Sequence, residues 1–204
     1  MTGIIDYGAG NLKSLCNTLD AIGSNRKIIR TPDDLDGITA IIFPGVGAFG
    51  DCVRHLKNQE LIKPLQEWIQ QDRPFLGICI GFQMLFEGSD ESPGSSGLGV
   101  LSGQVVSFPE IPGMKVPHMG WNHLNVRDTK DRAWEGLGSS PYFYFVHSFF
   151  PQPLDESIIA STTPYGQPFA SSVRRGRLLA TQFHPEKSQS AGSRLIRNFL
   201  DEAN

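Results

Sequence analysis

The sequence has few cysteines and no excess of basic charge. Only three of its 204 residues are cysteine, and none lies in a Cys-x-x-Cys pair or in a His/Cys cluster. A disulfide framework and a structural zinc site are therefore not expected, and reduced thiols are. Acidic residues outnumber basic ones by 21 to 18, which leaves no basic footprint for a nucleic-acid backbone. We expect no metal, no cofactor and no nucleic-acid partner.

Long apolar runs are missing as well. Residues 1–7 carry no basic stretch ahead of an apolar one, and no segment has the length of a bilayer-spanning helix. These absences predict a cytoplasmic protein with no membrane partner. Hydrophobic residues make up 39% of the chain, and we see no internal repeat or second core pattern. One globular domain is therefore expected over residues 1–204.

Short apolar runs alternate with amphipathic ones in the first part of the chain. The runs with the length of buried strands are residues 3–7, 27–30, 40–43 and 75–78. Apolar residues recur at helical spacing after the first run, and a two-part helical stretch ends at Gln71, with Pro64 in a new first turn. Strands that alternate with helices predict an α/β fold with a mostly parallel central sheet flanked by helices.

The second half of the chain is richer in strand patterns. Residues 88–97 are dense in Ser, Gly, Asp and Glu, which predicts an exposed loop. The strand candidates after this loop are residues 105–108, 121–126, 142–146, 158–162, 169–174 and 178–183. The closing helix carries its apolar residues at Leu195, Ile196, Phe199 and Leu200. We therefore expect an antiparallel extension of the parallel sheet.

One segment predicts a reactive cysteine. Residues 75–78 form an apolar strand that runs into Gly77-Ile78-Cys79-Ile80-Gly81 and then into a helical stretch. This is the thiol form of a nucleophile elbow, in which glycines two before and two after the nucleophile leave room for a sharp turn and expose the sulfur. The helix N-terminus favours the thiolate, because its dipole and unpaired amides stabilise negative charge.

Taken alone, a cysteine between two glycines is an equally good candidate for a small core residue. The other two cysteines fit that description better. Cys16 lies on the apolar face of the first predicted helix, and Cys52 lies in a helical stretch without any such turn. We interpret both as structural.

A base and its orienting carboxylate are expected at the end of another strand. His184 and Glu186 lie in Phe183-His184-Pro185-Glu186, and residues two apart on an extended segment point to the same side. The carboxylate can hold the imidazole in the tautomer that accepts a thiol proton. A histidine before a proline is more often a satisfied loop residue. Active sites of α/β proteins gather at the carboxyl ends of parallel strands, however, and both motifs are predicted there.

A third strand end is rich in glycine. Pro44-Gly45-Val46-Gly47 follows the strand at residues 40–43, and such a loop presents backbone N–H groups that an oxyanion needs. An ordinary turn is the alternative for this motif by itself. Together the three motifs supply a nucleophile, a base with its orienter and an electrophilic pocket, which is the set required for acyl transfer through a thioester.

These motifs resemble those of the class I (triad) glutamine amidotransferases. Gly-Ile-Cys-Ile-Gly-Phe-Gln at residues 77–83 and Phe-His-Pro-Glu at residues 183–186 carry the resemblance, in the order Cys, His, Glu. Ile80 and Phe82 stand where the family more often has Leu and Met, and both remain apolar. The segments that are similar to the glutaminase subunits of imidazole glycerol phosphate synthase are residues 5–11, 44–47, 116–122 and 144–148.

The resemblance implies a fold and an activity. The fold is that of a single-domain class I glutamine amidotransferase, and the reaction is hydrolysis of L-glutamine to glutamate and ammonia. The ammonia passes to a separate (βα)8-barrel cyclase subunit, in a heterodimer that serves histidine biosynthesis. Cys79 is then the nucleophile, His184 the base and Glu186 its orienter.

Further roles are carried over residue by residue. The backbone N–H of Ile80, which follows the nucleophile at the helix start, and that of Val46 are the expected oxyanion donors. The peptide between Gly45 and Val46 is expected to flip, so that this donor is in place only when the partner is bound. The implied glutamine contacts are Gly47, Gln83, His147, Ser148 and Phe149, and Gln83 lies one helical turn past Cys79.

The implied contact surface for the cyclase consists of Asn11, Pro117, Met119, Trp121 and Lys187. Exposed aromatic residues suit such a surface, although a core position on a strand remains the alternative for Trp121. Other readings of the chain are a glutaminase for a different synthase, a stand-alone cysteine hydrolase and a silent interaction subunit. A dinucleotide site after the first strand is disfavoured because position 13 is Lys in place of the third glycine.

Overall fold

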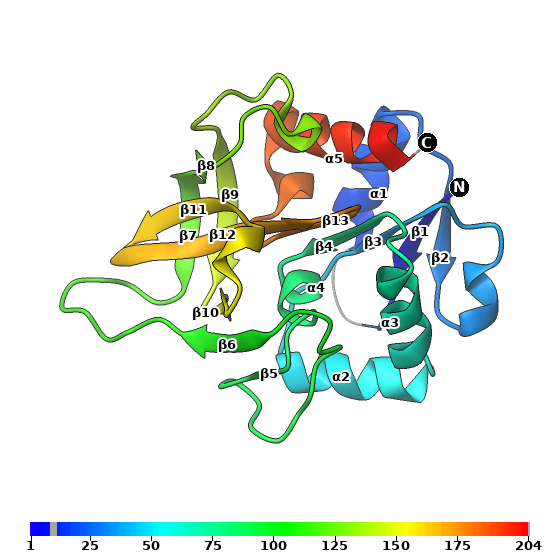
Figure 1. Cartoon of the computed structure of the whole chain (residues 1–204), viewed down its shortest axis with the longest axis horizontal. Helices are drawn as coiled ribbons and strands as arrows, with labels where there is room; N and C mark the ends of the chain where they lie inside the picture. Colours follow the sequence, from blue (N-terminus) through cyan, green and yellow to red (C-terminus); the bar gives the residue numbers. More distant parts are fainter. Residues whose placement is uncertain (9–11, 204) are drawn as a thin grey trace.

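An eight-stranded sheet forms the centre of the computed structural model, which describes residues 1–8 and 12–203 (Figure 1). Its strands, in spatial order, are β2 (Arg26–Ile29), β1 (Thr2–Ile5), β3 (Ala40–Phe43), β4 (Phe75–Ile78), β13 (Leu178–Thr181), β12 (Gln167–Arg175), β11 (Ile159–Tyr165) and β8 (Asn125–Val126). The five strands from β2 to β13 run parallel, and the remaining three pair antiparallel. The predicted α/β fold with an antiparallel extension is confirmed.

Strand β13 is the seam between the two halves of the sheet. Ala180 pairs in parallel with Gly77 of β4 and antiparallel with Val173 of β12. The strand is fully buried, as its unbroken apolar run predicts. The carboxyl ends of β3, β4 and β13 therefore lie side by side at one edge of the sheet.

Helices cover both faces of the parallel half (Figure 1). They are α1 (Leu12–Ala21), α2 (Phe49–Asn58), α3 (Ile62–Gln70), the short α4 (Ile80–Gln83) and α5 (Gln189–Ala203). Alternate side chains of each central strand feed two separate cores. Ile4 packs in the cluster with Leu15 of α1 and Leu195 of α5, whereas Ile5 packs with Leu56 of α2 and Leu65 of α3. This alternation is what a strand covered on both faces requires.

Two small sheets flank the central one. One contains β5 (Gly88–Ser89), β6 (Gly103–Ser107) and β10 (Phe149–Pro153), and the other pairs β7 (His118–His123) with β9 (Tyr142–His147). The single-turn helices are η1 (Pro32–Leu35), η2 (Arg132–Trp134), η3 (Glu156–Ile158) and η4 (Pro185–Lys187). Strand β10 was not predicted, and the predicted strand at residues 121–126 is divided between β7 and β8.

The prediction of an exposed loop at residues 88–97 is wrong in part. Strand β5 pairs with β6 and buries Ser89. The side chains of Glu91 and Ser92 bind the first turn of α2, because Phe49 N donates to Glu91 Oε2 at 2.8 Å and Gly50 N donates to Ser92 Oγ at 3.0 Å. A carboxylate at a helix N-terminus satisfies amides that have no partner within the helix, so polar residues anchor this segment.

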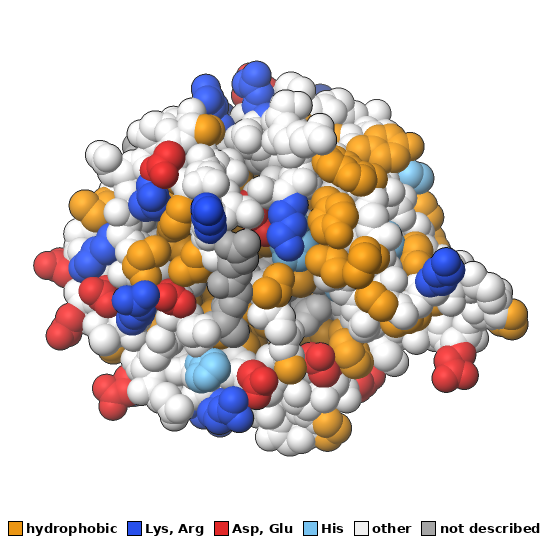
Figure 2. Space-filling model, turned by 180° about the vertical axis from the view of Figure 1, so that it is seen from behind, with side chains coloured by type: hydrophobic (Ala, Val, Ile, Leu, Met, Phe, Trp, Pro, Cys, Tyr) orange, Lys and Arg blue, Asp and Glu red, His pale blue; other side chains and the backbone are white. Residues whose placement is uncertain are grey.

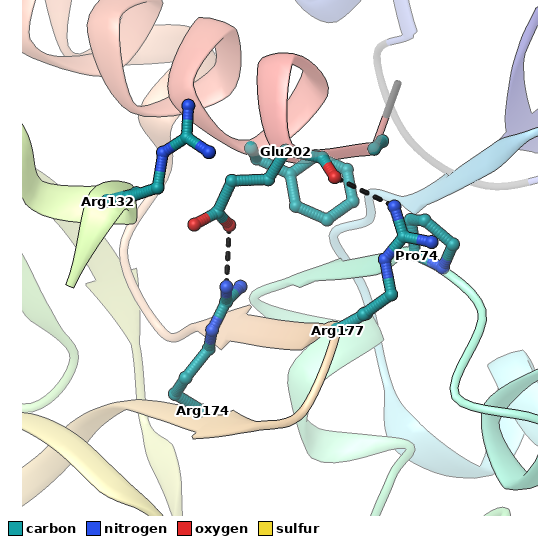
Figure 3. A pocket seen from close by; sticks show the side chains of 7 residues that line it. Pro74, Arg132, Arg174, Arg177 and Glu202 are labelled. Atoms are coloured by element: carbon teal, nitrogen blue, oxygen red, sulfur yellow. Dashed lines mark hydrogen bonds and ion pairs between the residues drawn. The ribbon is translucent and has the colours of Figure 1, made fainter.

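The last turn of α5 is held by two arginines, one near the end of β12 and one just before β13 begins. Arg174 Nη2 donates to Glu202 Oε2 at 2.6 Å, and Arg177 Nη2 donates to the carbonyl of Glu202 at 2.7 Å (Figure 3). These residues line a cavity of about 260 Å³ together with Pro74 and Arg132. Cations at a helix C-terminus are stabilising, and we interpret this cavity as a structural joint.

Candidate active site at the carboxyl ends of the central strands

Cys79 occupies a strained turn between β4 and α4. Its φ of 53° and ψ of −104° lie outside the conformations that residues with a Cβ usually adopt. A Cβ on Gly81 would collide with the carbonyl oxygen of Phe43, and one on Gly77 would meet the backbone of Gly81. The two glycines of the motif are therefore required by close backbone approach. This agrees with the predicted nucleophile elbow.

The Cys79 side chain is less exposed than the sequence predicted. Only 7% of the residue is accessible, because the elbow lies beneath the surrounding loops. Its backbone N–H donates to Thr181 O of the neighbouring strand at 2.7 Å. The sulfur is reached from one pocket and is not displayed on the surface.

His184 and Glu186 lie together at the end of β13. Nδ1 of His184 is 2.8 Å from Oε1 of Glu186, so Nδ1–H donates to the carboxylate and Nε2 is the nitrogen left for Cys79. Nε2 is buried and makes no hydrogen bond of standard geometry within residues 1–8 and 12–203. The backbone N–H of His184 donates to Tyr144 O at 2.9 Å, and its carbonyl accepts from Ser188 Oγ at 2.7 Å, so the backbone that carries the ring is held on both sides.

The electrostatics of the site favour a protonated imidazole. Burial lowers the pKa of His184, but the negative charge of the nearby Cys79 and the hydrogen bond to Glu186 outweigh burial and raise that pKa to about 10. An imidazole with this pKa is a cation at neutral pH. Cys79, His184 and Glu186 are therefore electrostatically coupled.

The pocket above Cys79 has a volume of about 290 Å³, which is suited to one small molecule. The predicted site residues that line it are Val46, Gly47, Cys79, Ile80, Gln83, His147, Ser148 and Phe149. Three further lining residues, Glu91, Pro117 and Val146, were not predicted as substrate contacts. Seven predicted residues, from strand ends, loops and helix α4, thus share one cavity with Cys79.

Gln83 reaches the pocket wall from α4 and is buried. Its Nε2 donates to Phe149 O at 3.0 Å and to Gln182 Oε1 at 3.3 Å. Gln182 in turn donates from Nε2 to Cys79 Sγ at 3.6 Å. Two glutamine side chains therefore connect the carbonyl of Phe149 to the Cys79 sulfur through hydrogen bonds.

The loop at residues 44–47, which follows β3, is held in place by Tyr7. The hydroxyl of Tyr7 donates to Val46 O at 2.8 Å, and burial raises the pKa of Tyr7, which keeps this hydroxyl protonated. A Cβ on Gly45 would collide with both Tyr7 and Ile80. Gly47 has a φ of 115° and Val46 is 36% exposed, so the outer part of the loop faces the pocket and solvent.

The predicted partner-contact residues lie on the surface. Pro117, Met119, Trp121 and Lys187 are all exposed, and Met119 and Trp121 keep 62% and 48% of their surface accessible. Hydrophobic side chains gather over the side of the molecule that carries β7 and β9 (Figure 2). The core position considered for Trp121 is therefore wrong. Asn11, the fifth predicted contact, lies outside the described residues.

Sequence reasoning missed Gln182, Glu91 and Tyr7. The spacing of two residues that linked His184 to Glu186 also links Gln182 to His184, and this signal was available. Glu91 acts on a helix that precedes it by some 40 residues, and Tyr7 acts on a loop at a similar distance. No local pattern predicts such pairings.

Neither a metal-binding cluster nor a membrane-spanning helix is found among residues 1–8 and 12–203. There, no group of three or more His, Cys, Asp or Glu side chains is placed to hold a metal ion. Across the same residues, no helix combines the length and apolar character needed to span a bilayer.

Solved structures share this fold, and one of them is a glutamine amidotransferase. A crystal structure of a glutamine amidotransferase is 25% identical and superposes with a TM-score of 0.77, covering 99% of this chain and 98% of that one. PurLQS from Thermotoga maritima, 17% identical, gives a TM-score of 0.78 over 100% of this chain and 98% of the other. At that identity the likeness concerns the fold alone.

Relatives identified by sequence share a higher identity with this chain than these two structures do. Residues 3–203 match the family described as glutamine amidotransferase class-I. The imidazole glycerol phosphate synthase subunit HisH of Rhodopirellula baltica is 47% identical, covering 98% of this chain and 96% of its own length. HisH of Methylococcus capsulatus is 43% identical over 97% and 94%. The chain therefore belongs to the class-I glutamine amidotransferases and, within them, to the family of HisH subunits of imidazole glycerol phosphate synthase.

Proposed function

We propose that the chain is the glutaminase subunit of an imidazole glycerol phosphate synthase and that Cys79, His184 and Glu186 hydrolyse glutamine. The observation that carries the proposal is the elbow cysteine at the base of a small pocket, beside a buried imidazole that is itself paired with a carboxylate. The identity of 42% to 47% with HisH relatives over nearly the whole chain supports this choice among the amidotransferases.

The proposed reaction has two halves. The Cys79 thiolate attacks the carboxamide carbon of glutamine, and the electron pair of the C=O bond moves to its oxygen. When the oxyanion collapses, the C–N bond breaks and His184 gives its Nε2 proton to the departing ammonia. The neutral imidazole then takes a proton from water, whose oxygen attacks the thioester and releases glutamate and the thiolate. Glu186 stabilises the imidazolium in both halves.

The oxyanion is proposed to bind two backbone N–H groups. The N–H of Ile80 is one of the first amides of α4, which have no acceptor within the helix. The second donor is Val46, from the loop across the pocket. Tyr7 holds the carbonyl of Val46, so the Gly45–Val46 peptide is the part of this loop proposed to turn when the partner is loaded.

The amino-acid end of glutamine is proposed to lie against Gly47, Gln83 and residues 147–149. These groups line the same pocket as Cys79, and a substrate held there presents its carboxamide to the sulfur. Pocket contacts of this kind position the reacting atoms, which contributes more to the rate than binding strength itself.

The partner is proposed to be a (βα)8-barrel cyclase, bound as a heterodimer over the surface that carries Pro117, Met119, Trp121 and Lys187. Ammonia would pass directly into that subunit, and both would work in the cytoplasm. The adjacency of this surface and the pocket supports the arrangement, because Pro117 belongs to both.

Glutamate release tests the proposal. The chain is assayed with glutamine alone, with a barrel cyclase, and with the cyclase and its nucleotide, in parallel with Cys79→Ala and the control Cys16→Ala. We expect strong activity only in the loaded complex, and its loss only in Cys79→Ala. Equal rates in all three mixtures would identify a stand-alone hydrolase, and activity that survives Cys79→Ala would overturn the assignment.

A further inference from the structure

A continuous series of hydrogen bonds runs from surface strand β7 to the Cys79 sulfur. It begins at Asn122, whose Nδ2 lies 3.3 Å from Nε2 of His118. His118 Nδ1 lies 3.0 Å from Nε2 of His147, and His147 Nδ1 lies 2.8 Å from Phe149 O. The same carbonyl accepts from Gln83 and so joins this series to the two glutamines already described.

The direction of every bond in this series is determined at its two ends. Asn122 Nδ2 also donates to Pro164 O at 2.9 Å, so the amide is oriented with its nitrogen toward His118. His118 therefore accepts at Nε2 and carries its proton on Nδ1. At the other end Phe149 O can only accept, which places the proton of His147 on Nδ1. Both ends give the same tautomers, with His118 donating to His147.

The two imidazoles are neutral and rigidly packed. Burial lowers the pKa of His118 to about 4 and that of His147 to about 3. His118 stacks on Tyr165 and Phe145, with ring centroids 3.9 and 4.7 Å away. Each ring therefore has one donor and one acceptor in a fixed place. A displacement of β7 is passed from His118 to His147 through the bond between the two rings.

The last bond acts on the nucleophile. Gln182 is fully buried, and its Oε1 accepts from Gln83, which leaves Nε2 facing Cys79. A donor to sulfur favours the thiolate and restricts where it lies. The titratable groups that face Cys79 from other elements are His184 with Glu186, Tyr7 and, across the pocket, Glu91. Replacing Gln182 changes none of them.

We propose that Gln182 is a positioning residue, which donates a hydrogen bond to the Cys79 sulfur and holds it for His184. Its own orientation is set from β7 through the hydrogen-bonded series, so that the strand bearing the proposed partner surface reaches the nucleophile through fixed polar contacts. The proposal rests on the function assigned to Cys79 above, and it adds a residue that acts on that cysteine without touching substrate.

The rate of alkylation at Cys79 tests this directly. Iodoacetamide modification is followed by peptide mass spectrometry as a function of pH, which separates Cys79 from Cys16 and Cys52. For Gln182→Leu we expect the midpoint of the pH profile to rise by about one unit, the effect of losing a hydrogen bond to a charged group. Gln182→Glu, close in shape but unable to donate, should shift it at least as far. Gln66→Leu is the control.

The far end of the series is tested by His118→Phe, which keeps the stacked ring but removes the donor. We expect a smaller upward shift of the same midpoint, and none for the control His123→Phe on the same strand. In the double variant with Gln182→Leu the His118 substitution should add nothing, because contacts in one network are not additive.

The outcomes separate this proposal from the function it builds on. Alkylation needs neither glutamine nor a partner, so a chain without glutaminase activity still gives a readable profile. A wild-type midpoint in folded Gln182→Leu and Gln182→Glu would overturn the positioning role. A His118→Phe shift that adds in full to that of Gln182→Leu would overturn the route from β7.

Discussion

At the scale of single residues, the site depends on a cysteine whose backbone is held in a conformation it would not adopt alone. The neighbouring glycines allow β4 and α4 to approach closely, and the bond from Cys79 N to Thr181 O holds the turn against β13. Strain of this kind persists only where the surroundings over-determine it. His184 follows shortly after Thr181, so the turn at Cys79 and the imidazole proposed as its base are positioned by the same segment of the chain.

The pKa of His184 gives a prediction at this scale. The Cys79 charge and Glu186 hold that pKa near 10. In Cys79→Ala the negative charge beside the imidazolium is lost, so the cation is less favoured and the pKa must fall. We expect an NMR titration to place the His184 midpoint at lower pH in Cys79→Ala than in the parent, with a further fall when Glu186→Gln is added. An unchanged midpoint in Cys79→Ala would show that the two side chains are not coupled.

Sequence patterns predicted the residues of this site better than the contacts between them. Cys79, His184 and Glu186 follow from turn chemistry and strand alternation, which are local. The roles of Glu91 and Tyr7 depend on contacts between segments that are distant in the sequence, and no periodicity of the sequence predicts such contacts. The expected exposure of the sulfur was wrong for the same reason, because the loops above the elbow come from distant segments.

At the scale of elements, the site is assembled by the placement of β13 between β4 and β12. Apolar runs predict which segments form strands. They do not predict the order of the strands in the sheet, because residues 75–78 and 178–181 are far apart in the sequence and pair only in the folded protein. Strands β5 and β10 were missed for a related reason. Both are short or contain proline, and they are held by pairing with β6 rather than by their own pattern.

The joint at the end of α5 gives a prediction at this scale. Glu202→Gln removes the charge that pairs with Arg174, whose side chain is only 21% exposed. Breaking such a largely buried pair should lower the free energy of unfolding by about 1–2 kcal/mol, as measured by urea denaturation. Glutaminase activity should be retained, because these residues lie at the opposite ends of the strands from Cys79.

A surface pair provides the control for this joint. Asp51→Asn breaks the exposed pair with Arg54 and should change the free energy of unfolding by less than about 0.5 kcal/mol. Equal effects from the two substitutions would mean that the contacts of Glu202 contribute no more than an ordinary surface ion pair.

At the scale of the whole molecule, the pocket and the exposed apolar surface adjoin each other through β7, β9 and the segment before β7. His118 is buried while Pro117 and Met119 on either side of it are exposed. One strand therefore contributes to the interior network with alternate residues and to the outer surface with the others. A partner bound there contacts the strand from which the hydrogen-bonded series runs to Cys79.

Trp121 gives the prediction at this scale. Large aromatic side chains near the centre of an interface contribute disproportionately to affinity. Trp121→Ala should raise the Kd for the cyclase by about 30-fold, which corresponds to about 2 kcal/mol, in isothermal titration calorimetry. The exposed apolar residue Leu154 lies outside the proposed surface, and Leu154→Ala should leave the Kd unchanged. A Trp121→Ala complex of full affinity would place the partner elsewhere.

The pairing of β4 with β13 also bears on how the protein is made. Cys79 and Gln182 are separated by 103 residues, and a ribosome delivers the first long before the second. The segments at residues 44–47 and 75–83 and half of the sheet therefore emerge before His184, the base proposed for Cys79, has been made. A chain that is released before residue 184 carries Cys79 without its proposed base, so we expect glutamine hydrolysis only from chains whose synthesis has passed β13.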